Sequence, residues 1–193
     1  MNSTLAKKTL IADLQQQIAA LGPTLCRAQS PLPSGFPPLD AAIEGWPVPG
    51  ISEISGPPGS GRIQISLPSL VQTSQHHRVA VVDPLQQLYP PGWKGIRLEH
   101  LLVVQPALEK STWAAEQLAR SGCFGIVALL DPPRLGRAAA RLARASEQGA
   151  CSLHLWTTEG DVRVPAKLRV QLLDRRGDRL HIRLPRTDTE LWL

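Results

Sequence analysis

The chain has 193 residues, is 42% hydrophobic and 19% charged, and carries a formal net charge of +5 at pH 7. This composition suits one domain with a hydrophobic core and excludes a membrane-spanning protein, because no apolar run approaches the roughly 20 residues of a membrane span. No signal peptide follows Met1, so we expect a cytoplasmic protein, and the positive charge favours an acidic partner such as nucleic acid.

Residues 10–21 are predicted to form an amphipathic helix apart from the main domain. Its apolar side chains lie on one stripe, formed by Ile11, Leu14, Ile18 and Leu21. A glycine and a proline end the helix and a proline-rich stretch follows, so we assign residues 1–28 to a helix and linker. The stripe packs either on its own domain or on a partner, including another copy of the chain, and is therefore a candidate docking element.

The remainder of the chain alternates between apolar strands and helices. The predicted strands cover residues 51–54, 79–83, 101–104, 124–130 and 152–157. The predicted helices cover residues 63–67, 85–88, 110–120 and 134–147, with a shorter one inside 34–43 and a stop or kink at Pro68. Two alternating segments, 167–173 and 179–184, flank a turn at 174–178 and form a hairpin. We predict an α/β fold with a mostly parallel sheet flanked by helices and a C-terminal antiparallel hairpin, with a core over 29–186 and a tail over 187–193.

A glycine-rich loop between the first strand and the next helix lies at the centre of this pattern. It comprises Gly56, Pro57, Pro58, Gly59, Ser60, Gly61, Arg62 and Ile63. Glycines in such a loop let several backbone N–H groups point at one anion, as in the phosphate-binding pattern G-x-x-x-x-G-K-[ST]. Arg62 stands where this pattern has lysine, and Ile63 stands where it has the hydroxyl that binds Mg²⁺. The loop therefore keeps the glycines of a phosphate site but not its chemistry.

Several segments around this loop occur in an order that is also found in a known protein family. They are residues 45–54 ahead of the loop and residues 117–122, which precede the apolar strand that ends at Asp131. With them, the chain from about residue 34 to residue 184 resembles the core ATPase domain of the RecA recombinase family. Within that superfamily it most resembles the ImuA-type proteins, which share the Ser-Gly-Phe-Pro-x-Leu-Asp opening found at residues 34–40.

The resemblance indicates which ATPase groups this chain lacks. A RecA-like ATPase uses a lysine on the phosphates, a hydroxyl on Mg²⁺, a glutamate that orients water and an aspartate near the metal. Arg62 and Ile63 replace the first two groups, and Leu85 stands at the position of the glutamate. Asp131 keeps the Walker B acid, while Thr158 lies near the position of a sensor glutamine. We expect no ATPase activity and no cofactor. The loop is then only a turn between strand and helix, and weak ATP binding by its backbone is the alternative.

Two groups of basic residues are candidates for binding nucleic acid or an acidic protein, although each is also readily explained as solvated surface. The first is a predicted helical stripe without acidic partners, made of Arg134, Arg137, Arg141 and Arg144. The second surrounds the C-terminal hairpin and comprises Arg163, Lys167, Arg169, Arg175, Arg176, Arg179 and Arg183. Most tryptophans are predicted to be packing residues, namely Trp46, Trp93, Trp113 and Trp156. Trp192 is predicted to be either flexible or an anchor for a partner.

The resemblance implies a non-catalytic accessory protein of DNA-damage-induced translesion synthesis, in the SOS response. Its implied partners are an inactive Y-family polymerase homologue, RecA or other replication and repair proteins, with single-stranded DNA as a further candidate. Two alternatives stay open: a weak DNA-dependent ATPase of the RecA type, and an SOS cell-division inhibitor of the SulA type. No metal site is expected, because the three cysteines are isolated in the sequence.

Overall fold

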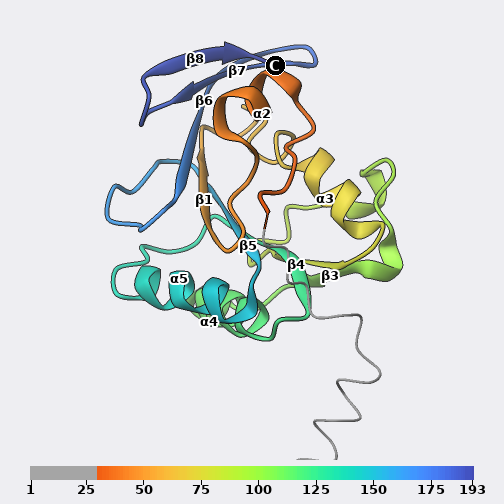
Figure 1. Cartoon of the computed structure of the whole chain (residues 1–193). Coiled ribbons are helices and arrows are strands. Elements are labelled where there is room, and N and C mark those ends of the chain that lie inside the picture. The colour runs from red at the N-terminus through yellow and green to blue at the C-terminus, as the bar shows by residue number, and fades with distance from the viewer. Residues whose placement is uncertain (1–29) are drawn as a thin grey trace, which may run out of the picture.

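The computed structural model describes residues 30–193, in which one mixed sheet of eight strands forms the centre of the fold (Figure 1). The strands are β1 (Gly50–Ser55), β2 (Arg78–Val82), β3 (Leu101–Val104), β4 (Phe124–Leu130), β5 (Ser152–Thr157), β6 (Leu168–Arg176), β7 (Arg179–Leu184) and β8 (Thr189–Trp192). They lie in the order β3-β2-β4-β5-β1-β6-β7-β8. The pairs from β3 to β6 are parallel, whereas β6, β7 and β8 pair antiparallel. The predicted α/β fold with a mostly parallel sheet and a C-terminal hairpin is confirmed.

Helices cover both faces of the sheet, as crossovers between parallel strands require. They are α2 (Pro37–Ile43), α3 (Leu67–Ser74), α4 (Leu108–Arg120) and α5 (Ala138–Gly149), with short 3₁₀ helices at Pro90–Gly92 and Leu98–His100. α4 and α5 lie side by side on one face, and α2 and α3 lie on the opposite side of the sheet (Figure 1). This arrangement leaves the carboxyl ends of β1, β4 and β5 together at one edge, where ligands bind in open α/β sheets.

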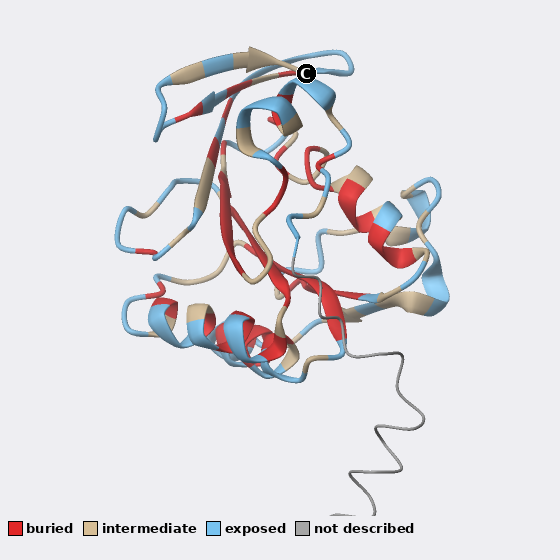
Figure 2. Cartoon of the chain, in the orientation of Figure 1, coloured by how far each residue is buried: buried red, intermediate tan, exposed pale blue. Residues whose placement is uncertain are grey.

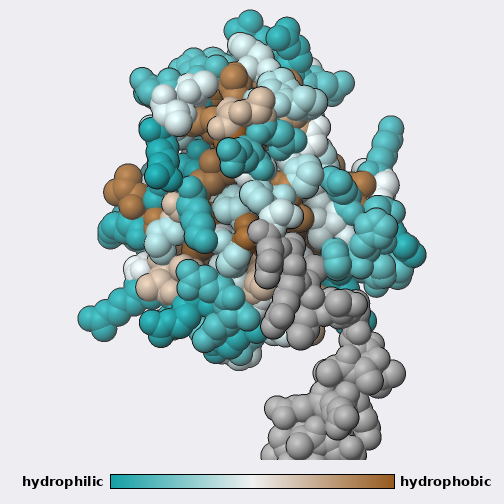
Figure 3. Space-filling view, viewed as in Figure 1, coloured by the Kyte–Doolittle hydropathy of each residue, from teal (hydrophilic) through white to brown (hydrophobic). Residues whose placement is uncertain are grey.

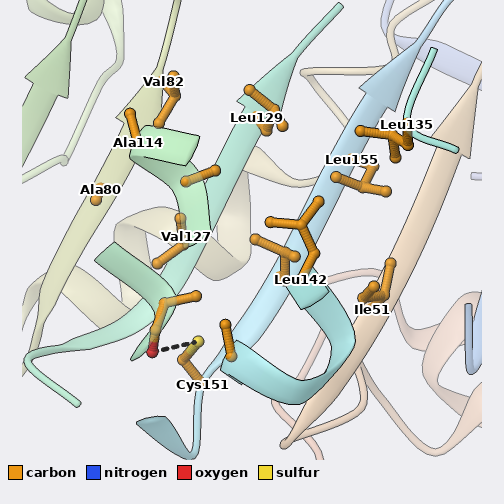
Figure 4. Packing of buried hydrophobic residues seen from close by; sticks show 14 of the residues in the cluster. Ile51, Ala80, Val82, Ala114, Val127, Leu129, Leu135, Leu142, Cys151 and Leu155 are labelled. Atoms are coloured by element: carbon orange, nitrogen blue, oxygen red, sulfur yellow. Dashed lines mark hydrogen bonds between the residues drawn. The ribbon is translucent and has the colours of Figure 1, made fainter. Parts of the chain in front are cut away.

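Two apolar clusters fill the space between the sheet and its helices (Figure 2). The first joins α4 and α5 to the sheet and includes Val127, Leu129 and Leu142 (Figure 4). At its edge the ends of α4 and α5 approach so closely that a Cβ at Gly149 would collide with the backbone carbonyl of Ala119, so only glycine fits there. The second cluster lies under α2 and α3 and contains the buried tryptophans Trp46 and Trp156, as predicted.

The helix after the glycine-rich loop begins later than predicted. Regular helix starts at Leu67, and the preceding residues 62–66 form turns. The prediction of a helix over 63–67 that Pro68 stops or kinks is therefore wrong. Pro68 lies instead in the first turn of α3, where its missing N–H has no partner to lose and its fixed φ suits a helix start.

Three further predictions differ from the structure. Residues 85–88 contain no helix, because Pro84 and Leu85 form a turn and the chain runs irregularly to the 3₁₀ helix at Pro90–Gly92. Residues 187–193, expected to be a tail, contain β8, which pairs with β7. The hairpin turn is also shorter than 174–178. It comprises only Gly177 and Asp178, because β6 runs to Arg176 and β7 begins at Arg179.

The face turned to the viewer in Figure 3 is mainly hydrophilic, with small hydrophobic patches between the elements.

A histidine is fully buried in the second cluster. His154 on β5 lies between the hydroxyls of Ser66 and Ser152, at 3.2 and 3.1 Å from its ring nitrogens, and its ring centroid is 4.9 Å from that of Trp46. Burial lowers the pKa of His154 from its ordinary value of 6.5 to about 3. The folded protein therefore holds this imidazole neutral throughout the neutral and mildly acidic range.

We predict that His154 makes stability fall as the pH is lowered from 6.5 toward 3. In that window the unfolded chain binds a proton that the folded chain excludes, so the free energy of unfolding decreases by up to about 1.4 kcal/mol per pH unit. Urea unfolding of the wild type and His154→Gln at pH 7, 6 and 5 measures this slope. The variant should lose part of the pH dependence; identical slopes for the two proteins would contradict the assignment.

Candidate functional site

The glycine-rich loop lies directly after β1, at the carboxyl edge of the sheet. Its first residue is tied to the neighbouring strand, because the Gly56 N–H donates to the carbonyl of Thr157 at 3.0 Å. Gly61 has φ 96° and a Cβ there would collide with the side chain of Leu180 on β7. The hairpin of β6 and β7 therefore packs against the loop through Leu180. Glycine is required at position 61 both by the backbone conformation and by this contact.

Arg62 turns away from the loop and forms an ion pair with Asp131, the acid at the expected Walker B position. Its Nη1 donates to Oδ1 of Asp131 at 2.7 Å, and its Nη2 donates to Oδ2 at 2.6 Å, which makes a bidentate ion pair. The Thr158 hydroxyl completes the group, because it accepts from Arg62 Nη1 at 3.1 Å and donates to Asp131 Oδ1 at 3.3 Å. The Arg62 side chain is only 7% exposed and that of Asp131 19%. We call these three residues the latch.

Each member of the latch comes from a different element. Arg62 follows the glycine-rich loop, Asp131 follows β4, and Thr158 follows β5, so the sheet brings together residues up to 96 positions apart. Asp131 has φ 40°, in the left-handed region that aspartate tolerates better than most residues. Asp83, at the end of β2, is also a hydrogen-bond acceptor, for the Leu88 N–H at 2.9 Å.

The residues at the loop do not fit a nucleotide with magnesium. Ile63 has no oxygen for a metal, and its side chain packs against the second apolar cluster. The charge that would meet a phosphate is neutralised by Asp131, and the acid that would lie near the metal is neutralised by Arg62. A planar guanidinium held in a bidentate pair is costly to detach, because both partners would be left partly buried without a counter-charge.

Beside the latch lies a pocket of about 720 Å³. It is lined by Glu53, Leu85, residues 131–135 and the loop that follows β5. Leu85, which stands at the position of the family's catalytic glutamate, thus lines the same pocket as Asp131, and its side chain cannot orient water. The structure places Asp131, Leu85 and Thr158 at one pocket, and the Walker B and sensor roles expected of Asp131 and Thr158 stay predictions.

A second buried ion pair lies at this pocket, since its acid, Glu53, is one of the lining residues. The side chain of Glu53 on β1 is 2% exposed and is paired with Arg169 on β6. Glu53 Oε1 also accepts from the Asp161 N–H at 2.7 Å, and Arg169 donates to the carbonyls of Asp161 and Val164 at 3.0 and 2.6 Å. Burial lowers the pKa of Arg169. Arg169 therefore ties the loop after β5 to the sheet and does not lie free for nucleic acid.

The first basic group does not form the predicted helical stripe. α5 begins at Ala138, so Arg134 lies in the preceding loop and Arg137 is the N-cap residue. The expectation that the group has no acidic partner is also wrong, because Arg141 Nε donates to Oε2 of Glu116 on α4 at 3.0 Å. Two prolines and Gly136 separate Asp131 from α5, and they delay the helix.

Most of the second basic group has partners inside the chain. Lys167 Nζ donates to the carbonyl of Pro49 at 2.7 Å. Several arginines pair with nearby acids, as in Arg163–Asp161, Arg176–Asp174 and Arg183–Asp188, and Arg175 donates to the Gly177 carbonyl. Arg163 beside Asp161 holds the pKa of that carboxyl below its ordinary value, chiefly through their side-chain hydrogen bonds. The group is therefore less available than its sequence suggests.

The last strand places Trp192 on its own sheet. Its ring stacks on His181 of β7 with centroids 4.6 Å apart, and the guanidinium groups of Arg176 and Arg179 lie 5.1 and 5.3 Å from it. The prediction that Trp192 is flexible is wrong, and the alternative that it anchors a partner stays a prediction. Trp113, predicted to be a packing residue, is instead exposed on α4.

Sequence reasoning missed two acids that organise the surroundings of the site. Glu53 falls within the predicted strand 51–54 and Glu116 within the predicted helix 110–120, with no role assigned to either, yet both are buried and paired with arginines. The available signal was the position of Glu53 one residue before Ile54 in a strand buried on both faces, where an acid requires a partner. The predicted N-terminal docking helix, with Ile11, Leu14, Ile18 and Leu21, lies outside the described residues.

Comparison with known proteins yields partial likenesses to RecA, whereas no family model matches the chain. RecA of Bacillus subtilis (strain 168) is 36% identical over 104 residues, which are 51% of this chain and 30% of that protein. RecA of Ruminococcus albus is 33% identical over 135 residues, or 64% of this chain and 34% of that protein. The chain spans about a third of the length of these curated relatives. Together with the sheet, the likeness supports a RecA-like superfamily. No helix within residues 30–193 has both the length and the apolar character needed to cross a membrane.

Proposed function

We propose that this protein is a non-catalytic RecA-like accessory protein of DNA-damage-induced translesion synthesis, which acts by binding other proteins and single-stranded DNA. The latch carries the proposal: Arg62 at the lysine position of the phosphate loop is paired with Asp131, the Walker B acid. Both groups neutralise each other inside the chain. The partial likeness to RecA supports the same family of tasks in DNA repair.

Several groups that ATP hydrolysis requires are replaced at once in this chain. Ile63 supplies no oxygen to a metal, and Leu85 supplies no carboxylate to position water. Losing one group that stabilises the transition state commonly costs a factor of about 10² or more in rate, and such groups act as a unit. A protein that keeps the RecA-like sheet without these groups serves as a scaffold.

The DNA contact is proposed for the rim of the pocket beside the latch. Arg134 and Arg163 line that pocket, and Arg134 is exposed and forms no ion pair with any residue in 30–193. Each phosphate contact of a single strand contributes a slope of about −0.7 in log K against log salt. Arg134→Ala should therefore weaken binding of oligo(dT) uniformly and reduce the slope by roughly that amount.

ATP turnover tests the proposal directly. We expect the full chain to hydrolyse ATP at background rates with and without single-stranded DNA, and to show no Mg²⁺-dependent binding of a fluorescent ATP analogue. RecA from Bacillus subtilis serves as the positive control under identical conditions. Turnover that is abolished by Arg62→Ala would refute the scaffold assignment and favour the alternative of a RecA-type ATPase. Capture of a tubulin-like division protein, and of no polymerase or recombinase, would favour the alternative of a cell-division inhibitor.

A further inference from the structure

A second pocket, of about 250 Å³, lies where α2 meets the antiparallel strands at the end of the sheet (Figure 1). The last turn of α2 and the start of β6 line it through Ile43 and Leu168, and the end of β7 adds Leu184. β6 runs parallel to β1, so the pocket lies at the amino ends of these strands. The latch follows the carboxyl ends of β4 and β5 and therefore lies at the other edge of the sheet.

The pocket has apolar walls that the backbone holds in place. Pro31 and Pro47 line it together with the aliphatic side chains of α2, β6 and β7. The segment before α2 is fixed, because the N–H groups of Leu32 and Trp46 donate to each other's carbonyls at 2.9 and 2.7 Å. A Cβ at Gly45 would collide with the carbonyl of Leu32, so the two segments are in close contact. The pocket is smaller than the roughly 300–1,000 Å³ of sites for drug-sized ligands, and it suits a single apolar side chain.

Two exposed cations with free donors line the pocket. Lys167 Nζ donates to the carbonyl of Pro49 at 2.7 Å, and an ammonium has three donors, so two stay available to a ligand. The Arg186 side chain forms no ion pair in the described part of the chain. Arg169 is a third lining cation, but its guanidinium is already paired with Glu53. The available positive charge therefore comes from Lys167 and Arg186.

The acids around the pocket offset only part of this charge. None of the lining residues is acidic. Glu44, the C-cap of α2, is exposed next to the lining residues and offsets one of the two positive charges. Asp188 in the turn before β8 is paired with Arg183, and Asp40 on α2 accepts from the Ser34 N–H at 2.7 Å. The pocket thus combines an apolar cavity with two available cations and one nearby acid whose side chain has no described partner.

We propose that this pocket binds the C-terminal residue of another protein, with its apolar side chain in the cavity and its carboxylate on Lys167 and Arg186. A C-terminal residue carries both groups on one Cα, whereas neighbouring side chains of an extended internal segment point to opposite sides. Capture of a terminal carboxylate is a recurring mode of peptide recognition. Residues 1–29, which precede the pocket-lining Pro31, are a poorer match, because they contain three cations and one acid.

This inference goes beyond the proposed function, because it names a second site and the chemistry of its ligand. The pocket and the latch lie at opposite edges of the sheet and share no residue. Loss of peptide binding would leave the ATP turnover result unchanged, and an unexpected ATPase activity would leave the pocket unaffected. The two proposals can therefore fail separately.

Fluorescence anisotropy with synthetic peptides tests the pocket. The probe is a fluorescein-labelled hexapeptide that ends in leucine with a free carboxylate, and two comparison peptides end in leucine amide or in glycine. We expect the full chain to bind the leucine acid at least about tenfold more tightly than either comparison peptide.

Two variants separate the carboxylate contact from the cavity. Arg186→Ala should weaken binding of the leucine acid about five- to tenfold and leave binding of the amide almost unchanged. Ala42→Leu keeps a good helix former at an exposed position of α2 that lines the pocket. Its larger side chain narrows the cavity and should weaken binding of the leucine acid at least about tenfold.

Matched controls exclude general attraction of charge. Lys94→Ala removes an exposed positive charge away from the pocket and should leave the affinity within about twofold. Glu44→Gln removes the opposing acid and should strengthen binding of the leucine acid about two- to threefold.

Three outcomes would overturn the proposal. The first is equal affinity for the acid and the amide peptide, or wild-type affinity in both Arg186→Ala and Ala42→Leu. The second is tighter binding of N-acetyl-leucine than of the hexapeptide, which would reassign the pocket to a small aliphatic carboxylate. The third is peptide binding that appears only in Leu25→Ser, which would assign the pocket to the preceding segment of this chain.

Discussion

Replacing Arg62 with methionine is expected to lower the free energy of unfolding by about 3 kcal/mol. The change removes both hydrogen bonds to Asp131 and leaves a carboxylate that is 19% exposed without its counter-charge. Breaking a buried ion pair by removing one partner costs about 3–5 kcal/mol, and some access of water to Asp131 places this case at the lower end. Guanidinium chloride unfolding of the wild type and the variant measures the difference.

The companion variants show whether the cost comes from the pair or from the arginine stem. Asp131→Asn should destabilise similarly, because it strands a nearly buried guanidinium while asparagine still suits the φ of 40°. The double variant Arg62→Met/Asp131→Asn should recover much of the loss. The exposed pair Arg176–Asp174 is the control, and Asp174→Asn, which leaves Arg176 over Trp192, should leave the stability almost unchanged. Additive losses in the double variant would show that Arg62 and Asp131 are not coupled and would remove the basis of the latch.

Arg169→Met is expected to have an effect of similar or larger size, about 3–5 kcal/mol, at neutral pH. The Glu53 carboxylate is 2% exposed and would keep only the Asp161 N–H as a described partner. The variant also loses the two hydrogen bonds from Arg169 to the carbonyls of Asp161 and Val164. Hydrogen exchange should therefore accelerate in the loop after β5, and chemical denaturation should report the loss of stability.

The pH dependence of the Arg169 variant identifies the cause. Without the guanidinium, the buried carboxylate of Glu53 lacks its counter-charge, so protonation relieves the cost of burying it. The folded variant then binds the proton more readily, so its stability deficit relative to the wild type should shrink as the pH falls toward 4. Lys167→Met, which removes an exposed hydrogen bond to Pro49, is the control and should cost about 1 kcal/mol or less. A deficit that does not change with pH would mean that lost packing, and not the stranded acid, destabilises the protein.

The Arg62–Asp131 pair explains how a loop of this type can keep its conformation without a bound phosphate. In a nucleotide-binding loop the lysine and the Walker B acid face phosphate and metal, and each charge is neutralised by the ligand. Here Arg62 and Asp131 neutralise each other, so the carboxyl edge of the sheet keeps its geometry without a ligand.

Local patterns predicted the sheet well. The apolar run that became β4 has the predicted bounds, because a strand buried on both faces is continuously apolar and is bounded by turn residues. β3 and β5 also span the predicted residues. The glycine-rich loop after the first strand was also readable, since its residues are local in the chain, and its assignment as a degenerate phosphate loop stays a prediction. Helix starts were less predictable: Pro68 suits the first turn of a helix as well as it ends one, and Gly136 delayed the start of α5.

The sequence by itself determined the class of fold and the order of its elements, because both depend on neighbouring residues. Only the tertiary structure decided what the charged residues do. Arg62 and Asp131 are 69 positions apart, and Arg169 and Glu53 are 116 apart, and only the order of the strands brings them together. An arginine that pairs with a buried acid and one that faces solvent look the same in a sequence, because the electrostatic partner is chosen by the fold.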